Sequence, residues 1–259
     1  MCTVPGDEDP RAAGHVSEGG VARVKEDAEG AGPSAEGAPQ PRHSGPPRVE
    51  DVPLREAEPQ LHERIRTVLH RHKAMWSGQA MGAIKATRHH IELAPGAKPV
   101  RVLPRRAGPK ARDAEAAEIE RQLAAEVIEP TSSEWGFLVV LVPKKDGTLR
   151  FCVDYRLLNA VSKRDSYPLP RMDECIDSLD EAKVFSTLDC NAGYWQVLTA
   201  VGDREKTAFV CHKGAYHYKR MPFGLTNAPA TFQLALDIIL SDVKWQSCLV
   251  YPDDIIVYS

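Results

Sequence analysis

Three aspartates stand where predicted strands end, with no basic residue beside them in the sequence. Asp189 follows the apolar run Val184–Leu188, and Asp253 with Asp254 follows Ser247–Val250. Unpaired carboxylates at such positions need cations. If the two strands are neighbours in one sheet, Asp189 and Asp253 can converge on two divalent ions about 3.5–4 Å apart, an arrangement that supports in-line nucleotidyl transfer. An isolated pair of aspartates, however, is more often only a polar hairpin turn.

A β-hairpin is predicted upstream of these aspartates. Phe137–Pro143 is a continuous apolar run, and Leu149–Val153 returns as a second strand after the dipeptide Asp146-Gly147. An Asp-Gly pair between two such runs is a strong signal for a tight hairpin, because both residues tolerate a positive φ. The hairpin should therefore carry lysines at its tip.

Apolar periodicity and turn residues predict the remaining elements of an α+β fold. Pro130 should stop one helix, and Asn227 with Pro229 should open another. Helices are predicted at Leu61–Trp76, Asp113–Ile128, Met172–Leu179 and from Asn227 onward, the last with an apolar face of Phe232, Ala235, Leu236, Ile239 and Leu240. Strands are predicted at Val184–Leu188, Lys206–Val210, Tyr216–Arg220, Ser247–Val250 and Ile255–Ser259, the second and third as an antiparallel pair.

Charge divides the N-terminal part of the chain in two. Residues 1–60 carry 6 Lys and Arg against 12 Asp and Glu and are rich in Gly and Pro, so a disordered tail is predicted. Residues 61–112 carry 12 against 2, and their prolines favour an extended basic lead-in after the first helix. Such a stretch suits nucleic-acid phosphates, although a solvated linker or an acidic protein partner would fit the same composition.

The cysteines and the hydropathy of the sequence indicate the cellular compartment of the protein. The six cysteines are scattered without a C-x-x-C pair, and no histidine stands at a zinc-ligand spacing from them, so reduced thiols are expected. No apolar run approaches the length of a membrane span, and the N-terminus lacks an apolar leader. The sequence therefore predicts an intracellular protein without a membrane partner, in the cytoplasm or the nucleus.

Seven ordered blocks between residues 127 and 259 resemble the gypsy-type LTR retrotransposon reverse transcriptases, whose fingers and palm are part of a Pol polyprotein. The blocks are VIEPTSSEW, VPKKDGTLRFCVDYRLLN, YPLPR, LDCNAGYWQV, KTAFV, MPFGLTNAPATF and YPDD. The resemblance implies a small fingers subdomain and a ferredoxin-like palm, an antiparallel sheet backed by helices. The expected domains are the tail at 1–60, the lead-in at 61–112, and an incomplete fingers and palm domain at 113–259.

The resemblance also implies roles for single residues in an RNA-directed DNA polymerase, which adds dNTPs to a primer 3′-end on an RNA or DNA template. Asp189 and Asp253 correspond to the shared ligands of two magnesium ions, which manganese can replace, and Asp254 to a more peripheral third carboxylate. Tyr194 corresponds to the steric gate that excludes a ribose 2′-hydroxyl. Taken alone, Tyr194 would be read as an ordinary core aromatic.

Further residues correspond to the family's dNTP contacts. Arg150, with Lys144 or Lys145 on the hairpin, is implied as the triphosphate clamp, a role that suits a forked guanidinium and an ammonium group. Phe223 and Gly224 are implied as the floor of the nucleotide pocket. Without the resemblance, the lysines would be a solvated hairpin tip and the Phe-Gly pair a plain loop.

Two departures from the family pattern change the expectation. The small residues that usually follow the tryptophan of the first block are replaced by Gly136-Phe137-Leu138, which affects the template contacts of the fingers. The second residue of the Y-x-D-D turn is Pro252, whose φ is locked near −65° and which has no N–H. The usual tight turn needs a positive φ there, so a weakened or inactive polymerase is predicted.

The chain stops within the predicted strand Ile255–Ser259, so it is expected to be a fragment that lacks the thumb, RNase H and integrase portions of the polyprotein. The alternative is a non-catalytic remnant, either a decayed element or a co-opted nucleic-acid-binding module. An RNA-dependent RNA polymerase on the same palm fits less well, because the bulky Tyr194 should exclude ribonucleotides.

Overall fold

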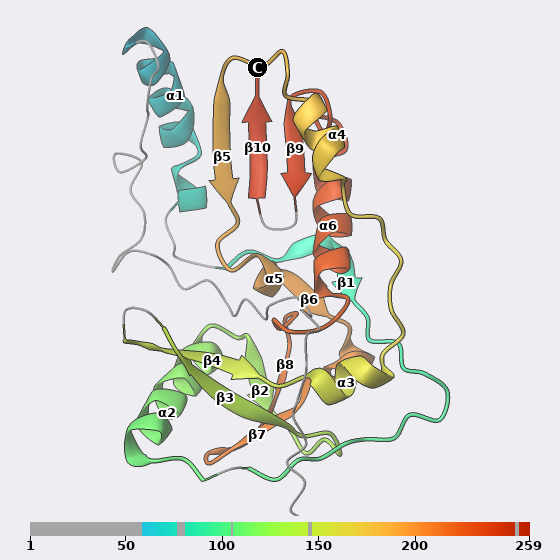
Figure 1. The fold of residues 1–259 in the computed structure, drawn as a ribbon. Helices are drawn as coiled ribbons and strands as arrows, with labels where there is room; N and C mark the ends of the chain where they lie inside the picture. Colours follow the sequence, from blue (N-terminus) through green and yellow to red (C-terminus); the bar gives the residue numbers. More distant parts are fainter. Residues whose placement is uncertain (1–58, 77–80, 105, 145–146, 252–253) are drawn as a thin grey trace, which may run out of the picture. The chain divides into compact units, whose positions relative to one another are not determined.

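The computed structural model describes residues 59–76, 81–104, 106–144, 147–251 and 254–259 (Figure 1). All of them belong to one structural unit, Ala35–Ser259. The predicted disordered tail at 1–60 lies almost entirely outside the described residues, as do Lys145, Pro252 and Asp253. No helix among the described residues is long and apolar enough to cross a membrane.

A five-stranded sheet with the order β2-β8-β7-β3-β4 carries the predicted hairpin. Its strands are β2 Ile128–Pro130, β8 Gly214–Tyr218, β7 Phe209–Cys211, β3 Phe137–Pro143 and β4 Leu149–Val153. Neighbouring strands are antiparallel except β3 and β7, which run parallel. Helix α2 (Pro109–Ala124) contacts β2 and β4. Its buried Ile119 joins a core cluster with Phe151 and Phe209.

A three-stranded antiparallel sheet with the order β5-β10-β9 carries the predicted aspartates (Figure 1). Its strands are β5 Phe185–Asp189, β10 Asp254–Tyr258 and β9 Cys248–Tyr251. Helix α6 (Ala228–Ile239) packs against β9 and against β1 (Ile84–His89), which pairs in parallel with β6 (Val197–Thr199). The helix therefore ties the lead-in of the chain to the sheet with the aspartates.

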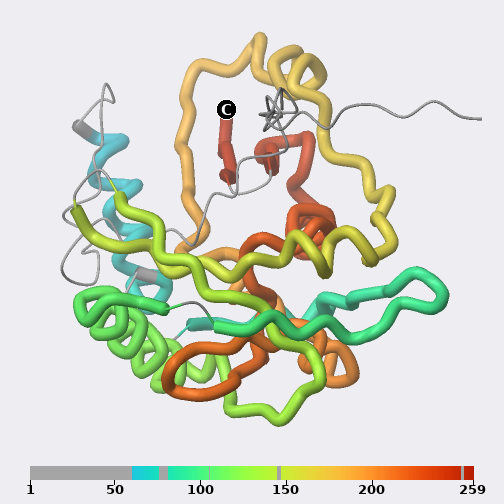
Figure 2. The backbone as a smooth tube through the Cα atoms, turned by 60° about the horizontal axis from the view of Figure 1, so that its bottom comes forward, coloured from blue at the N-terminus to red at the C-terminus, as the bar shows by residue number. Residues whose placement is uncertain are grey.

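Six further helices complete the described part of the chain. They are α1 Pro59–Arg71, α3 Arg156–Val161, α4 Met172–Asp177, α5 Gly193–Gln196 and the 3₁₀ helices η2 Lys73–Trp76 and η3 Val201–Thr207. After β1 the lead-in runs past α3 and the start of β3, as Figure 2 shows. Backbone hydrogen bonds fix it there, from Ala94 N to Val161 O, from Lys163 N to Glu92 O and from Gly136 N to Val100 O.

The predicted elements agree with the observed ones best at the two hairpins. Strands β3 and β4 have the predicted bounds, while the helix expected at Asp113–Ile128 begins at Pro109 and ends at Ala124. A proline suits the first turn because its missing N–H has no partner there in any helix. The lead-in therefore ends at Gly108, four residues before the predicted end at Arg112. Glu126, with a φ of 52°, reverses the chain into β2.

Two further expectations about secondary structure and burial are corrected. Lys206 was predicted in a strand but belongs to η3, and the strand starts at Phe209. Ile239 was placed on the buried face of α6 but is 51% exposed, whereas Phe232, Ala235 and Leu236 of that face are buried. Leu240, the last residue of the predicted face, packs against the core cluster, so among these five residues it is Ile239 that does not share the buried face.

Candidate active site

Asp189 and Asp254 are paired across neighbouring antiparallel strands. Asp189 is the last residue of β5 and Asp254 the first of β10, and the register places them directly opposite each other. Opposed side chains lie on one face of a sheet with Cβ atoms about 4.5–5.5 Å apart. Both side chains are exposed. The sequence predicts that Asp189 and Asp253 meet if Val184–Leu188 and Ser247–Val250 are neighbours. In the sheet, β10 separates β5 from β9, so the neighbour of β5 is the strand that follows the aspartates, and the residue opposite Asp189 is Asp254.

The chemistry of this pair suits a hard divalent cation. Two carboxylates face the same side, and no hydrogen bond or ion pair with another described residue neutralises either of them. Magnesium prefers such oxygen ligands and keeps several waters, so it needs few protein groups. The described residues contain no group of three or more metal-binding side chains, and Asp253, the third predicted ligand, lies outside them.

Ala192, in the left-handed backbone conformation, turns the chain from β5 toward Tyr194, the predicted steric gate. Ala192 has φ 49° and ψ 46°, and Gly193 N donates a hydrogen bond to Cys190 O at 3.1 Å. Gly193 touches the core so closely that a Cβ atom there would lie 2.7 Å from Cζ of Phe232. Only glycine permits this approach, which begins α5 and sets the direction of the next residue.

That next residue, Tyr194, lies in the core beside the predicted pocket floor. Its ring stacks on Phe223 with centroids 4.8 Å apart and planes 20° apart, and it tilts against Phe232 at 5.4 Å. The residue is 9% exposed. The structure therefore brings together two predicted site residues, Tyr194 and Phe223. It also packs Tyr194 in the core, as expected for the alternative interpretation of this residue as an ordinary core aromatic.

Asn159 holds the loop that contains Phe223 and Gly224. Its Nδ2 donates to Gly224 O at 2.8 Å, and its Oδ1 accepts from Thr226 N at 2.9 Å. Gly224 has a φ of +88°, which side chains rarely adopt, so glycine is required at this turn. Asn159 belongs to the same sequence block as Arg150, but sequence reasoning did not single it out. Its partners lie 65 and 67 residues away, and no local pattern reveals them.

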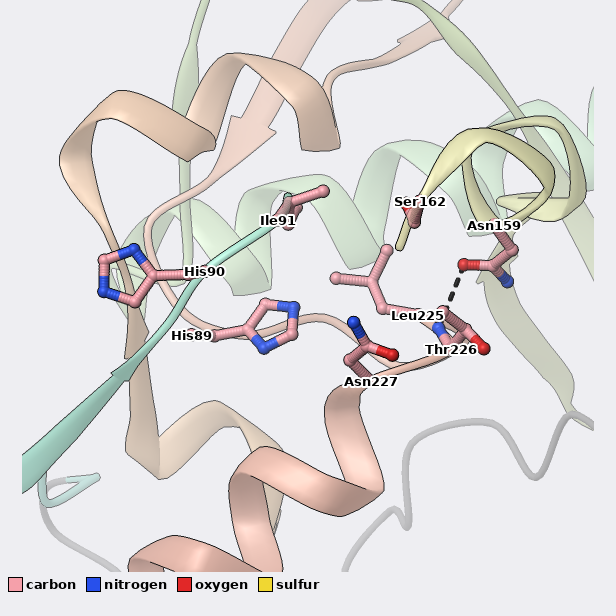
Figure 3. A pocket seen from close by; sticks show the side chains of 8 residues that line it. All are labelled: His89, His90, Ile91, Asn159, Ser162, Leu225, Thr226 and Asn227. Atoms are coloured by element: carbon pink, nitrogen blue, oxygen red, sulfur yellow. Dashed lines mark hydrogen bonds between the residues drawn. The ribbon is translucent and has the colours of Figure 1, made fainter. Parts of the chain in front are cut away.

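A small pocket lies behind this loop, as Figure 3 shows. It is lined by His89, His90, Ile91, Asn159, Ser162, Leu225, Thr226 and Asn227. Its volume of about 10 Å³ is enough for one water molecule and far too small for a nucleotide. His89 is buried here, with Nδ1 2.9 Å from Thr231 Oγ1, and burial lowers its pKa to about 4.

The predicted triphosphate clamp belongs to the five-stranded sheet. Arg150 lies in β4 opposite Val142, and Lys144 closes the hairpin through a hydrogen bond from its N to Thr148 O at 2.8 Å. Gly147 has a φ of +80°, as expected for the predicted Asp-Gly turn. Nε of Arg150 is buried without a hydrogen-bond partner in the described part of the chain. No hydrogen bond or ion pair between described residues joins Arg150 or Lys144 to the carboxylates of Asp189 or Asp254.

A buried polar network behind β9 was also missed by sequence reasoning. Asp237 accepts from the Tyr167 hydroxyl at 2.7 Å and from Gln233 Nε2 at 2.8 Å, and it pairs with Lys244 at 2.6 Å. Burial and the hydrogen bond to Asp237 raise the pKa of Tyr167 to about 12. Gln233 Nε2 also lies 3.4 Å from Val250 O, so the network supports the strand that leads to the aspartates.

Comparison with known proteins shows which family the chain resembles. Residues 142–259 match the family described as "Reverse transcriptase (RNA-dependent DNA polymerase)". The chain is 44% identical over 112 residues to an RNA-directed DNA polymerase homolog of Oenothera berteroana, covering 43% of this chain and 79% of that protein. It is 41% identical over 151 residues to the Retrovirus-related Pol polyprotein from transposon opus of Drosophila melanogaster, covering 55% of this chain. The match spans only 15% of that polyprotein.

Solved structures show the same fold. The foamy viral protease-reverse transcriptase in complex with an RNA/DNA hybrid superposes with a TM-score of 0.70 at 22% identity, over 79% of this chain and 27% of that one. A second structure of that viral protein, in complex with double-stranded DNA, gives 0.68 at 23% identity over 79% and 36% of the two chains. The predicted α+β fold with fingers and palm is confirmed. The chain belongs to the reverse transcriptase family and is related to the Pol polyproteins of LTR retrotransposons.

Proposed function

We propose that this chain carries the polymerase site of an RNA-directed DNA polymerase, which adds deoxynucleotides to a primer 3′-end on an RNA or DNA template. The observation that carries the proposal is the pairing of Asp189 with Asp254 at the adjoining ends of β5 and β10. Residues 113–259 form the fingers and palm in this proposal, and residues 61–112 the basic lead-in.

The carboxylates of Asp189, Asp253 and Asp254 are the proposed ligands of two divalent cations, magnesium or manganese. Bound there, such ions supply positive charge to the triphosphate and to the oxygens that attack and leave. The protein's own contribution is to hold the carboxylates of Asp189 and Asp254 on one face of the sheet without an ion pair to a described residue, because a neighbouring lysine or arginine would compete for them.

Binding of the nucleotide is assigned to two groups of residues. Tyr194, stacked on Phe223 next to Gly224, forms the sugar side of the pocket, where a bulky ring leaves no room for a 2′-hydroxyl. Lys144, Lys145 and Arg150 on the fingers hairpin bind the triphosphate. The guanidinium of Arg150 forms no ion pair with a described residue, which supports this role because a forked guanidinium suits a triphosphate.

Pro252 should lower the rate of this reaction. Tyr251 and Asp254 are paired across β9 and β10, which leaves a two-residue loop at positions 252 and 253. Two-residue hairpin loops favour turn types with a positive φ at the first position, which proline cannot adopt. A type I or II turn accepts proline but splays the strands, and a displacement of about 1 Å costs on the order of 10²-fold in rate.

Primer extension on a primed RNA template tests the proposal. The chain and its Pro252→Val variant are compared with and without Asp189→Asn, in Mg²⁺ and in Mn²⁺. We expect Pro252→Val to extend the primer on the order of 10²-fold faster than the parent, and Asp189→Asn to reduce both to background. Extension that survives Asp189→Asn would contradict the assigned site.

A second candidate function is a non-catalytic nucleic-acid-binding remnant, which the proline in the aspartate turn favours. Its signature is binding to primed template without extension by either the parent or the Pro252→Val protein. Equal extension rates for those two proteins would show instead that the turn argument is wrong.

A further inference from the structure

Helix α1 and the turn that follows it lie in a strongly basic segment of the chain. Residues 61–112 carry 12 Lys and Arg against 2 Asp and Glu, and 11 of the 12 are described. None of the 11 forms an ion pair with a described residue. Many cations elsewhere are paired, for example Lys213 with Glu120 and Arg171 with Asp173. The described part of the chain therefore supplies no ion-pair partner for these 11 cations, which suits the binding of an external anion.

Two of the three cations of α1, Arg64 and Arg71, lie on one side of the helix, whereas the half-buried Arg66 lies on the other side. Arg64 and Arg71 are exposed and lie seven residues apart, which is two turns and about 10.5 Å along the helix axis. Lys73 is exposed in η2 directly after the helix, and Glu63 is the only acidic residue between Pro59 and Trp76. A row of charges at such spacing suits a linear polyanion better than a single small anion.

The apolar residues of α1 argue against a membrane surface as the ligand. Leu61, Ile65 and Leu69 are already half-buried, so the helix does not offer them to a bilayer. Val68 and Met75 are exposed, at 52% and 77%, and they do not form a wide apolar face by themselves. A helix that binds bilayers in the interface plane needs such a face along its whole length.

We infer that α1 with η2 is an accessory element that binds nucleic-acid phosphates without reading sequence. It lies outside residues 142–259, the part of the chain that matches the family. The choice of nucleic acid as the ligand rests on the proposed function, whereas the unpaired charge and its spacing do not. Binding through phosphates releases counterions, so it should depend steeply on salt.

The test compares two triple variants that remove the same net charge. Arg64→Gln/Arg71→Gln/Lys73→Gln removes the three exposed cations of α1 and η2 and keeps the half-buried Arg66. The control, Lys163→Gln/Arg171→Gln/Lys213→Gln, removes three exposed cations that are paired with Glu92, Asp173 and Glu120. Binding of a fluorescein-labelled RNA/DNA hybrid to the whole chain is followed by anisotropy across a salt series, with phosphatidylserine vesicles as the alternative ligand.

We expect the α1 variant to weaken hybrid binding by between about 10-fold and 500-fold at 0.1 M salt and to flatten the slope of log affinity against log salt by about 2–3. The control should change neither by a comparable amount. The inference is overturned if the two variants behave alike, or if only vesicle binding responds to the α1 changes.

Failure of this inference can be told apart from failure of the proposed function. The two proposals have different readouts, since Asp189→Asn tests the polymerase site by loss of primer extension, whereas the α1 variant tests the accessory element by hybrid binding and its salt slope. A chain that extends primers but shows no loss of binding in the α1 variant would retain the polymerase assignment and refute the accessory element.

Discussion

Asp189 at the end of β5 and Asp254 at the start of β10 share one rung of an antiparallel ladder. Side chains alternate between the two faces of a sheet, so a slip of one residue would move Asp254 to the opposite face and separate the carboxylates. The register is set by four further paired positions, from Leu188 with Ile255 to Phe185 with Tyr258. The geometry of the site is therefore a consequence of strand pairing and needs no unusual backbone at these two residues.

Gly193→Ala should destabilise the protein by about 1–3 kcal/mol, because the new Cβ would lie 2.7 Å from the fully buried ring of Phe232. Relief of that overlap has to move Phe232 or Tyr194, so the site is disturbed as well. Gly202→Ala is the matched control, since nothing lies within 4 Å of a Cβ there. Urea unfolding measures both, and equal midpoints for the two variants would show that the close approach is not needed.

Asn159→Ala should release the loop that carries Phe223 and Gly224. Two hydrogen bonds are lost, to Gly224 O and from Thr226 N, at a cost of about 1–3 kcal/mol. Hydrogen exchange of the Thr226 amide is the sharper readout and should become faster. Leu157→Ala on the exposed side of the same helix is the control. Unchanged protection of the Thr226 amide in the Asn159 variant would contradict the role of Asn159 in holding this loop.

His89 should make the stability depend on pH. Its pKa is lowered from 6.5 to about 4 mainly by burial, with a smaller lowering by His90 and opposing contributions from Asp203 and Asp165. The unfolded chain therefore binds the proton more tightly than the native one. The free energy of unfolding is unaffected above pH 6.5 and falls as the pH drops from 6.5 toward 4, by about 2 kcal/mol at pH 5.

The measurement is urea unfolding at pH 7.5 and pH 5 for the parent, His89→Gln and His72→Gln, the last an exposed histidine of the lead-in. Between pH 7.5 and pH 5, the free energy of unfolding should fall by the same amount in the parent and the His72 variant. In the His89 variant it should fall by less, because the contribution of His89 is missing. If all three proteins respond to pH alike, His89 is not the group responsible.

The strands that hold the site could be predicted because their signals are local. Phe137–Pro143 and Leu149–Val153 are apolar runs on either side of an Asp-Gly turn, and the strands around the aspartates are short apolar runs bounded by polar residues. Their pairing could be stated only as a condition, since nothing in the sequence specifies that β5 neighbours β10. Ion binding, nucleotide binding and the effect of Pro252 remain predictions.

The features that could not be predicted depend on contacts between distant segments. Strand β1 forms because Ile84–His89 pairs with β6, more than 100 residues later, and its own apolar pattern is weak. Asn159 is a polar helix residue that binds the loop at Gly224 and Thr226, and Asp237 accepts from Tyr167, which lies 70 residues earlier in the chain. Short-range periodicity reports which face of an element is apolar, and it carries no information about such long-range polar contacts.

Cation binding by the paired aspartates is the most direct test of the site. Manganese(II) binding to the chain, measured by electron paramagnetic resonance, is compared with Asp189→Asn/Asp254→Asn and with the control Asp113→Asn/Asp242→Asn, which removes two exposed aspartates elsewhere. We predict that the first double variant loses the bound ion and that the control retains it. Equal Mn²⁺ affinity in the parent and the Asp189/Asp254 variant would contradict the assignment of these carboxylates as the cation site.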